Sequence, residues 1–433
     1  MGRAASRSFE VPPSAARLTS SLRDIGYDFP TAVADLVDNS VAAGASQVDI
    51  DLTFDGADSS VTIADDGSGM TANGLLEALR FGTRRNYSLS DLGRYGLGLK
   101  TAPLSQCRSL TVVTRRSVIN RMITRRTLDL DLVAEWDSWL VVEAHPTPAV
   151  ERAIDRLQDM QGTVVVWEKL DRVLPSGNPD GGWARRRLTA HADRLRSHLG
   201  MVFHRFIEGT GDRLPLAITV NGEKVRPWNP FAPDEPGTVE LPAQSFEINS
   251  GESTGEVRLR SFILPPRDRF SSLAEFERLS GPLRWNRQQG LYAYRANRLV
   301  QWSGWNGLRA IDEHTKLARA AIDFDTDLDS AFHINVAKMR VSIPAELKQM
   351  LERPIHELCM RAGDAYRKSA KEEPETEPRA STPAATRGTA PMPSAGLALS
   401  AAAMELGHSK ALREVVALVR ERDPHLVESL GFG

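Results

Sequence analysis

Three short blocks of polar and glycine residues between positions 35 and 100 constrain this chain more than any other feature of its sequence. They read Asp-Leu-Val-Asp-Asn at 35–39, Asp-Asp-Gly-Ser-Gly at 65–69, and Gly-Arg-Tyr-Gly-Leu-Gly at 93–98. In physical terms they are a carboxylate and an amide on one helix, an acidic glycine turn, and a glycine loop of phosphate size. Together they predict a pocket for a nucleotide and its metal ion.

The first block is expected on a helix that Asp28 caps and that has Pro30 in its first turn. Asp35, Asp38 and Asn39 follow the spacing i, i+3 and i+4, so they share one helix face. Asn39 can give its amide oxygen to Mg²⁺, and Asp35 can polarise a water molecule one turn away. Taken alone, such a spacing is more often the solvated acidic face of a helix.

The second block follows a predicted strand at 61–64. A carboxylate at Asp65 can accept a hydrogen bond from the exocyclic amino group of adenine. Gly67 and Gly69 allow the backbone to approach the base closely, and Met70 can pack against its ring. The competing interpretation is an ordinary Asp-Gly turn after a strand.

The third block ends a predicted loop at 82–98, of a length typical of functional lids, and leads into a predicted helix at 97–104. Free N–H groups at a helix start bind phosphate, and Lys100 can reach a terminal phosphate. A lone glycine loop is more often only a flexible segment. Because no strand precedes it, the sequence excludes a Rossmann-type dinucleotide site.

The pattern of apolar residues predicts an α+β chain with two structured domains and a tail. We expect helices at 14–25, 71–80, 183–209, 307–322 and 344–368, and strands at 46–54, 109–115, 118–126, 138–144, 163–167, 215–221, 238–248, 255–264 and 290–301. The predicted organisation is an α/β sandwich over 1–172 with an N-terminal strap, a second α+β domain over 173–368, a disordered linker at 369–395 and a short helical tail at 396–433.

Composition excludes several classes of protein. The 433 residues carry a net charge of only −2, so any contact with nucleic acid must come from local patches. Two cysteines, Cys107 and Cys359, cannot form a disulfide framework, which is typical of a reducing cytoplasm. No apolar run approaches the roughly 18 residues that a membrane helix needs, so we expect a cytoplasmic protein without a membrane span.

The ordered set of blocks resembles the N, G1 and G2 boxes of the GHKL ATPases, which include gyrase B, MutL, heat-shock chaperones, histidine kinases and MORC proteins. Gly162-Thr163 resembles the family's last element, and the sequence is most similar to bacterial MORC-like ATPases. The resemblance implies a Bergerat fold, a transducer-like second domain, and ATP and Mg²⁺ as cofactors. It also implies a nucleotide site formed by Asn39, Asp65, Gly67, Gly69, Met70, Gly93, Gly96, Leu97, Gly98, Leu99, Lys100, Thr101 and Thr163, with Asn39 as the metal ligand.

Two further roles follow from the resemblance. The family's general base is usually Glu, and the matching residue here is Asp35, which is one methylene shorter, so hydrolysis is expected to be slow. Asp38 is a possible second base, although its position in the family is usually not catalytic. The stretch at 332–341 resembles the MutL and gyrase transducer segment whose lysine contacts the γ-phosphate, which makes Lys338 the expected switch lysine.

The resemblance implies an ATP-dependent homodimer that closes as a clamp and acts on DNA. Arginines crowd the predicted lid, the hairpin at 109–126 and the start of the helix at 183, and they could form a basic face. The alternatives are a chaperone-like protein clamp and a nucleotide switch that hydrolyses slowly or not at all. A partner protein could bind through the tail.

Overall fold

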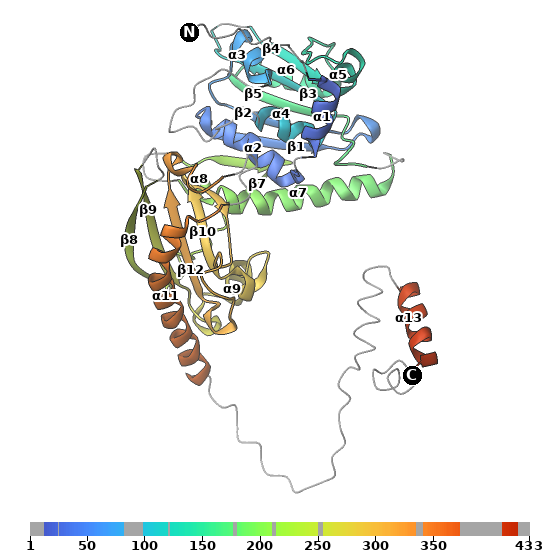
Figure 1. Cartoon of the computed structure of the whole chain (residues 1–433). Helices are drawn as coiled ribbons and strands as arrows, with labels where there is room; N and C mark the ends of the chain where they lie inside the picture. Colours follow the sequence, from blue (N-terminus) through green and yellow to red (C-terminus); the bar gives the residue numbers. More distant parts are fainter. Residues whose placement is uncertain are drawn as a thin grey trace, which may run out of the picture. The chain divides into compact units, whose positions relative to one another are not determined.

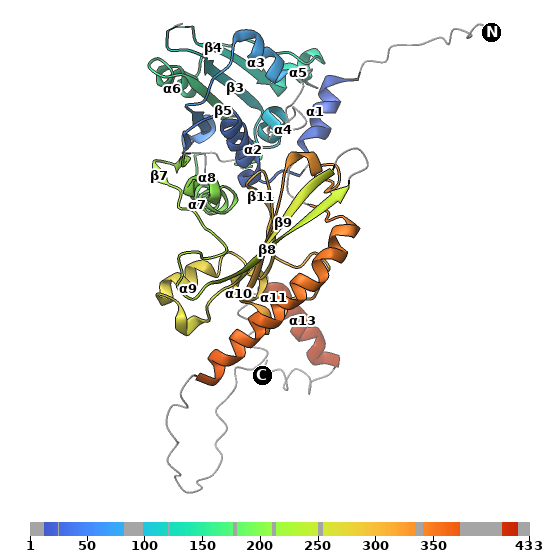
Figure 2. The same ribbon diagram turned by 90° about the vertical axis from the view of Figure 1, so that its left-hand side faces the viewer.

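A computed structural model of the chain describes residues 13–24, 26–81, 98–119, 122–175, 180–209, 214–249, 254–334, 341–372 and 409–422. Residues 1–373 form one compact unit, and residues 374–433 form a second. The first unit contains two sheets, each with its own helices (Figures 1 and 2). The expected α+β class is therefore confirmed.

The first sheet has seven strands in the order β4-β3-β5-β2-β1-β6-β7. Every neighbouring pair is antiparallel except β1 and β6, which run parallel. The strands are β1 Gln47–Thr53, β2 Ser60–Asp65, β3 Ser109–Arg115, β4 Thr124–Asp129, β5 Gly162–Glu168, β6 Ala217–Val220 and β7 Glu223–Lys224.

Helices cover both faces of this sheet. They are α1 Ala15–Arg23, α2 Phe29–Ala42, α3 Ala72–Leu79, α4 Gly98–Leu104, α5 Leu130–Trp136, α6 Pro148–Arg156, α7 Gly182–Val202 and α8 His204–Glu208. Alternation along β5 separates two cores: Val165 and Trp167 pack on the side of α2 and α7, whereas Val164 and Val166 pack against α6. The result is the sandwich of helices on a mixed sheet that the sequence predicted.

The division between the two sheets does not coincide with the expected boundary at residue 172. The long helix α7 contributes Leu188, Leu195 and Leu199 to the core of the first sheet, and β6 and β7 extend that sheet on the far side of β1. Thus α7 and the strands after it complete the first sheet before the second begins.

The second sheet has five strands in the order β11-β10-β12-β9-β8, with β10 and β12 parallel and the other pairs antiparallel. The strands are β8 Val239–Asn249, β9 Thr254–Ile263, β10 Gly290–Arg295, β11 Arg298–Gln301 and β12 Ala318–Phe324. The long helix α11, Ala345–Glu372, packs Leu347, Leu351 and Ile355 on one face. Two short helices, α9 Leu273–Leu279 and α10 Arg284–Gln288, precede β10.

Three sequence-based expectations for elements are corrected. The helix expected at 307–322 is replaced by a short 3-10 turn at Glu313–Thr315 and the strand β12. Strand β12 lies between β10 and β9, and pairing on both edges overrides the helical preference of its alanines. The strand expected at 138–144 is only a bridge from Val142 to Thr127, and the one expected at 118–126 begins at Thr124.

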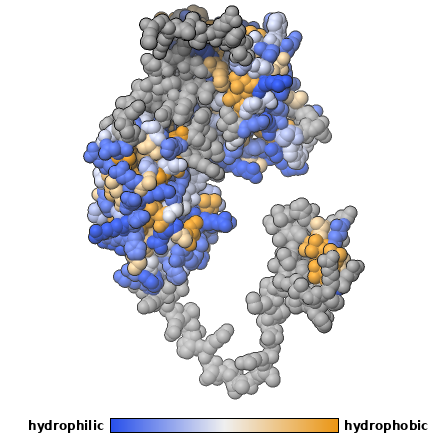
Figure 3. Space-filling view, in the orientation of Figure 1, coloured by the Kyte–Doolittle hydropathy of each residue, from blue (hydrophilic) through white to orange (hydrophobic). Residues whose placement is uncertain are grey.

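The second unit contains the helix α13, Ser409–Arg422, within the predicted tail. Figure 3 shows apolar side chains gathered on this helix, and Val415 and Leu418 are among the exposed large apolar residues of the chain.

Candidate functional site

Helix α2 presents the first block of the sequence to the interior of the molecule. Asp28 caps the helix, with its carboxylate accepting a hydrogen bond from the N–H of Thr31, as the sequence predicted. Asp35 and Asp38 are both buried, at 3% and 0% exposure, whereas Asn39 is half-buried. Within the described residues, no group hydrogen-bonds to the Asn39 side chain, so its amide is available to a ligand.

The start of α4 lies directly against Asp35. A Cβ atom on Gly98 would lie 2.5 Å from Oδ2 of Asp35, so a larger residue here would displace that carboxylate. The Tyr27 hydroxyl donates a hydrogen bond to the same oxygen at 3.2 Å. Burial, together with the neighbouring Asp35 charge, raises the pKa of Tyr27, so the phenol remains a neutral donor. The first and third blocks therefore meet at the carboxylate of Asp35.

The second block lies at the end of β2 and is tied to α2. Ser40 donates its hydroxyl to Oδ2 of Asp65 at 2.9 Å, and the N–H of Gly67 donates to Oδ1 at 3.0 Å. Burial raises the pKa of Asp65, although the hydrogen bonds from Gly67 and Ser40 oppose that effect. Among the described residues, no cation forms an ion pair with Asp65. This carboxylate is thus held by neutral donors beside α2.

A row of polar side chains continues from Asp65 across the neighbouring strands. Asp65 is opposite Thr163 on β5, and Thr163 is opposite Thr114 on β3. The two threonine hydroxyls lie 3.2 Å apart, and Thr114 also accepts the N–H of Met70 at 2.8 Å. Gly162 precedes the row with φ of +141°, and a Cβ there would lie 1.9 Å from the Asp65 carbonyl. Gly69 lies in the same turn as Gly67.

Helix α4 carries three further expected site residues, Leu99, Lys100 and Thr101. Lys100 and Thr101 are buried, and Leu99 packs at the edge of the core. The Lys100 ammonium donates to the carbonyl of Ala78 in α3 at 2.8 Å. Burial lowers its pKa to about 8, with an opposing effect from Glu77. Lys100 therefore reaches the end of α3 in this structure. The expected residues Gly93, Gly96, Leu97 and Lys338 lie outside the described residues.

Asp38, the possible second base, is engaged elsewhere. Its Oδ1 accepts a hydrogen bond from Nε of Arg298 on β11 at 2.9 Å, and the arginine is only 3% exposed. The two residues are 260 positions apart in the chain. A buried carboxylate in an ion pair is not free to take a proton from water, so Asp35 remains the candidate base.

Sequence reasoning missed several residues that hold this site together. Tyr27, Ser40, Thr114 and Arg298 each bond a residue of the predicted site or its helix. Ser40 follows the first block directly and lies one turn beyond Leu36, so its position on α2 was a usable signal. The others have no local pattern, because their partners are distant in the sequence.

The arginines expected to form a basic face fall into two groups. In the hairpin and its approach, Arg115 is buried against backbone carbonyls, Arg108 pairs with Asp131, and Arg126 pairs with Glu143. On α7, by contrast, Arg185, Arg186 and Arg194 are exposed, and no described carboxylate forms an ion pair with them. Arg116, directly after β3 in the hairpin, is likewise exposed, and no described carboxylate forms an ion pair with it. The available positive charge is therefore on α7 and at Arg116.

Two properties of the described residues bear on cofactor and location. These residues hold no group of three or more His, Cys, Asp or Glu side chains placed to bind a metal ion. A magnesium ion that takes most of its ligands from phosphates and water needs no such group, and the amide of Asn39 suits it. None of the helices in this part of the chain is long and apolar enough to cross a membrane.

Comparison with known proteins agrees with this geometry. Residues 27–163 match the family described as histidine kinase-, DNA gyrase B- and HSP90-like ATPases. The chain is also similar to ATPase morc-1 of Caenorhabditis elegans, with 36% identity over 89 residues. That stretch covers 21% of this chain and 10% of the relative, so the similarity spans only about a tenth of the worm protein.

Proposed function

We propose that this chain, whose residues 27–163 match the histidine kinase-, DNA gyrase B- and HSP90-like ATPases, is a Mg-ATP-dependent clamp that acts on DNA. Its similarity to ATPase morc-1 supports the ATPase part of the proposal. In this proposal two copies close on each other when ATP binds, and hydrolysis reopens them. Binding energy is thereby converted into a change of shape, as in other nucleotide switches.

One observation carries the nucleotide part of the proposal. Parts of the three blocks that are separate in the sequence meet in space, since Gly98 approaches Asp35 and Ser40 bonds Asp65. The turn after Asp65 reaches Thr114 through Met70, and Thr114 bonds Thr163. An acceptor for adenine and a carboxylate for water therefore lie on adjoining elements.

Each residue is assigned a chemical role. Asp65 accepts from the amino group of adenine, and Thr163 helps to hold the base. Asn39 would hold the metal, which when bound supplies positive charge beside the phosphates. Asp35 orients the attacking water and takes its proton, while Tyr27 and Gly98 keep the carboxylate in place. Because Asp is shorter than the family's usual Glu, turnover is slow.

The catalytic role is tested with Asp35→Asn, which keeps the shape of the side chain but removes the base. Phosphate release should fall by about 10²-fold or more, while ATP binding measured by calorimetry is retained. The matched control is Asp155→Asn on the exposed surface of α6, which should leave both quantities unchanged. Equal turnover in wild type and Asp35→Asn would refute the catalytic role and favour the switch that does not hydrolyse ATP.

The DNA part of the proposal rests on α7. Its 21 residues span about 30 Å, and Arg185, Arg186 and Arg194 are exposed along it without a described carboxylate partner. Asp193, the acidic residue of this helix, is already paired with Arg196. Exposed guanidinium groups carried on a rigid helix suit the regularly spaced phosphates of a duplex.

The DNA contact is tested by replacing Arg185, Arg186 and Arg194 together with alanine. Duplex affinity should fall, and the slope of log K against log salt should become shallower by about one unit for each phosphate that the variant no longer neutralises. The control is Arg126→Ala on β4, an arginine that Glu143 already neutralises. A wild-type chain without salt-dependent binding to duplex DNA would favour the chaperone-like clamp.

Closure is tested by gel filtration with light scattering. A non-hydrolysable ATP analogue should double the mass of the wild-type chain, and Asn39→Ala should abolish that change because it loses the metal ligand. An elution position that the analogue does not alter would refute the clamp, whatever the turnover.

A further inference from the structure

We infer that Arg298 is a positioning residue that couples the nucleotide site to the second sheet through its buried ion pair with Asp38. The inference rests on the proposed ATP site. It adds to that site a residue 260 positions beyond Asp38, in a sheet that contributes none of the three blocks. Arg298 acts through α2 and touches neither the nucleotide nor the water.

The position of Arg298 is set by a tight turn. Strands β10 and β11 are joined by Ala296 and Asn297, which both have positive φ, at 46° and 69°. Two consecutive residues of this kind form the hairpin turn that matches the twist of the strands. Arg205 of α8 donates to the side-chain oxygen of Asn297 at 3.3 Å, which fixes the tip of the turn. The turn therefore fixes the backbone position of Arg298.

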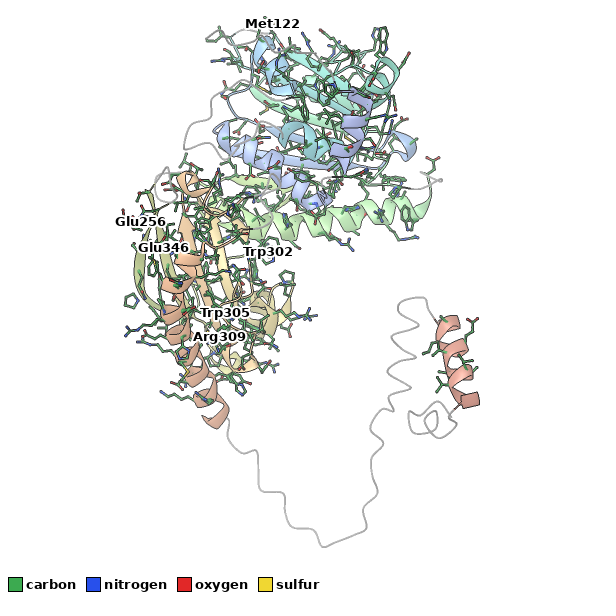
Figure 4. All side chains as sticks on the ribbon, in the orientation of Figure 1. Met122, Glu256, Trp302, Trp305, Arg309 and Glu346 are labelled. Atoms are coloured by element: carbon green, nitrogen blue, oxygen red, sulfur yellow. The ribbon has the colours of Figure 1, made fainter. Side chains whose placement is uncertain are left out.

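The surroundings of the pair exclude water. Asp38 is fully buried, and the Arg298 guanidinium lies 5.8 Å from the ring centre of Phe203, at the end of α7. Trp302, labelled in Figure 4, follows β11, and its ring lies 6.0 Å from that of His198 on α7. Separating two buried charges costs much more than moving them together. A shift of α2 is therefore transmitted to β11 rather than absorbed by breaking the pair.

The place of Asp38 on α2 makes that coupling relevant to the nucleotide. Asp38 directly precedes Asn39 and lies one turn after Asp35, on the same helix face. A helix moves as a unit, so a displacement at Asp38 displaces the proposed base and the proposed metal ligand together. Conversely, a nucleotide that pulls on Asn39 also pulls on Arg298. By reciprocity, the second sheet affects nucleotide binding as much as nucleotide affects the second sheet.

The same turn offers a matched control. Arg295 is directly opposite Arg298 across the hairpin, and it forms a second buried ion pair, with Asp329, at 2.6 and 2.7 Å. This second pair stays among the elements of the second sheet, whereas the Asp38–Arg298 pair joins that sheet to α2. The two pairs match in chemistry and burial and differ in what they connect.

The test replaces each pair with apolar residues, which avoids leaving one charge buried alone. We expect ATP affinity in Asp38→Leu/Arg298→Met to differ from wild type by the coupling factor, about tenfold. Turnover should also fall, because the proposed base and metal ligand on α2 are held less well in position. In hydrogen exchange, a non-hydrolysable ATP analogue should slow the amides of the β10–β11 turn in wild type and not in this variant. Arg295→Met/Asp329→Leu should keep both the turnover and the exchange response. Arg298→Lys, which keeps the charge but loses the planar donor, should lie between wild type and the double variant.

Wild-type turnover and exchange response in Asp38→Leu/Arg298→Met would overturn the inference, and so would equal losses in the Arg295 control. If the double variant does not fold, Arg298→Lys decides: a wild-type kcat together with a wild-type exchange response would also overturn it. A wild-type chain that binds no ATP would instead refute the proposed function, so the two failures can be told apart.

Discussion

The buried carboxylate at the end of β2 and those near the β10–β11 turn are held in opposite ways. Asp65 accepts from a serine hydroxyl and a backbone N–H, both neutral, and burial raises its pKa. Asp38 and Asp329 each accept from an arginine guanidinium in a buried ion pair. All three are at most 8% exposed, so burial alone does not distinguish them.

The difference separates a carboxylate that can serve a ligand from carboxylates that join elements. An ionised carboxylate has about four acceptor positions. The two neutral donors to Asp65 occupy only some of these positions, so others remain available to adenine. An arginine instead neutralises the charge of its carboxylate and fixes its geometry, so removing the arginine alone is strongly destabilising. Replacements at the two places should therefore affect different quantities.

The largest effect is expected when one arginine is removed alone. Arg298→Met leaves Asp38 buried without its guanidinium partner, which should lower the free energy of unfolding by about 3–5 kcal/mol. Urea denaturation followed by circular dichroism measures that loss. Arg295→Met removes the guanidinium partner of Asp329 in the same way and should lower the free energy of unfolding by a similar amount. A loss below about 1 kcal/mol at either position would show that the pair is not the main support of its carboxylate.

A smaller effect, and on a different quantity, is expected at Asp65. Asp65→Asn removes the charge that accepts from adenine, so ATP affinity should weaken by about 2 kcal/mol, or about 30-fold. The free energy of unfolding should change much less than in Arg298→Met, because the variant no longer buries a charge. Calorimetry with ATP and urea denaturation measure the two quantities separately.

Asp66→Asn is the control for this substitution. Asp66 is the next residue in the chain, but its carboxylate accepts hydrogen bonds from the N–H groups of Ser46 and Gln47 rather than from Ser40 and Gly67. It should leave ATP affinity unchanged. If Asp66→Asn weakened ATP binding as much as Asp65→Asn, the proposed hydrogen bond from adenine to Asp65 would be wrong.

The comparison also shows what sequence reasoning can reach. Helix α2, its Asp28 cap and the strand before Asp65 were predictable, because each is set by local spacing and capping chemistry. Thr163 could be assigned by resemblance, and the structure places it opposite Asp65. These features depend on residues within a few positions of one another, or on an ordered set of motifs.

Long-range features were out of reach for a physical reason. The partner of Asp38 lies 260 residues away, and nothing in the local sequence of Arg298 indicates that it is buried against α2. Strand β12 was predicted as a helix, because its alanines favour helix locally while its pairing with β10 and β9 is decided by the fold. The same limit applied to the hairpin arginines, whose carboxylate partners become visible only in the structure.

An effect on the pH dependence of stability is expected at Lys100, whose buried ammonium donates to the carbonyl of Ala78. Its pKa is lowered by burial to about 8 from an ordinary value of 10.5. Between those two pH values the unfolded chain holds the proton and the folded chain does not. The free energy of unfolding should therefore rise with pH across that window, with Lys100 contributing to the slope.

Lys100→Met should remove that contribution, so its stability should rise less steeply than wild type between about pH 8 and 10. Urea denaturation at several pH values across that window measures the slope. Lys224→Met, at an exposed position on β7, is the control and should keep the wild-type slope. Identical slopes in wild type and Lys100→Met would mean that the folded chain holds this ammonium charged throughout the window.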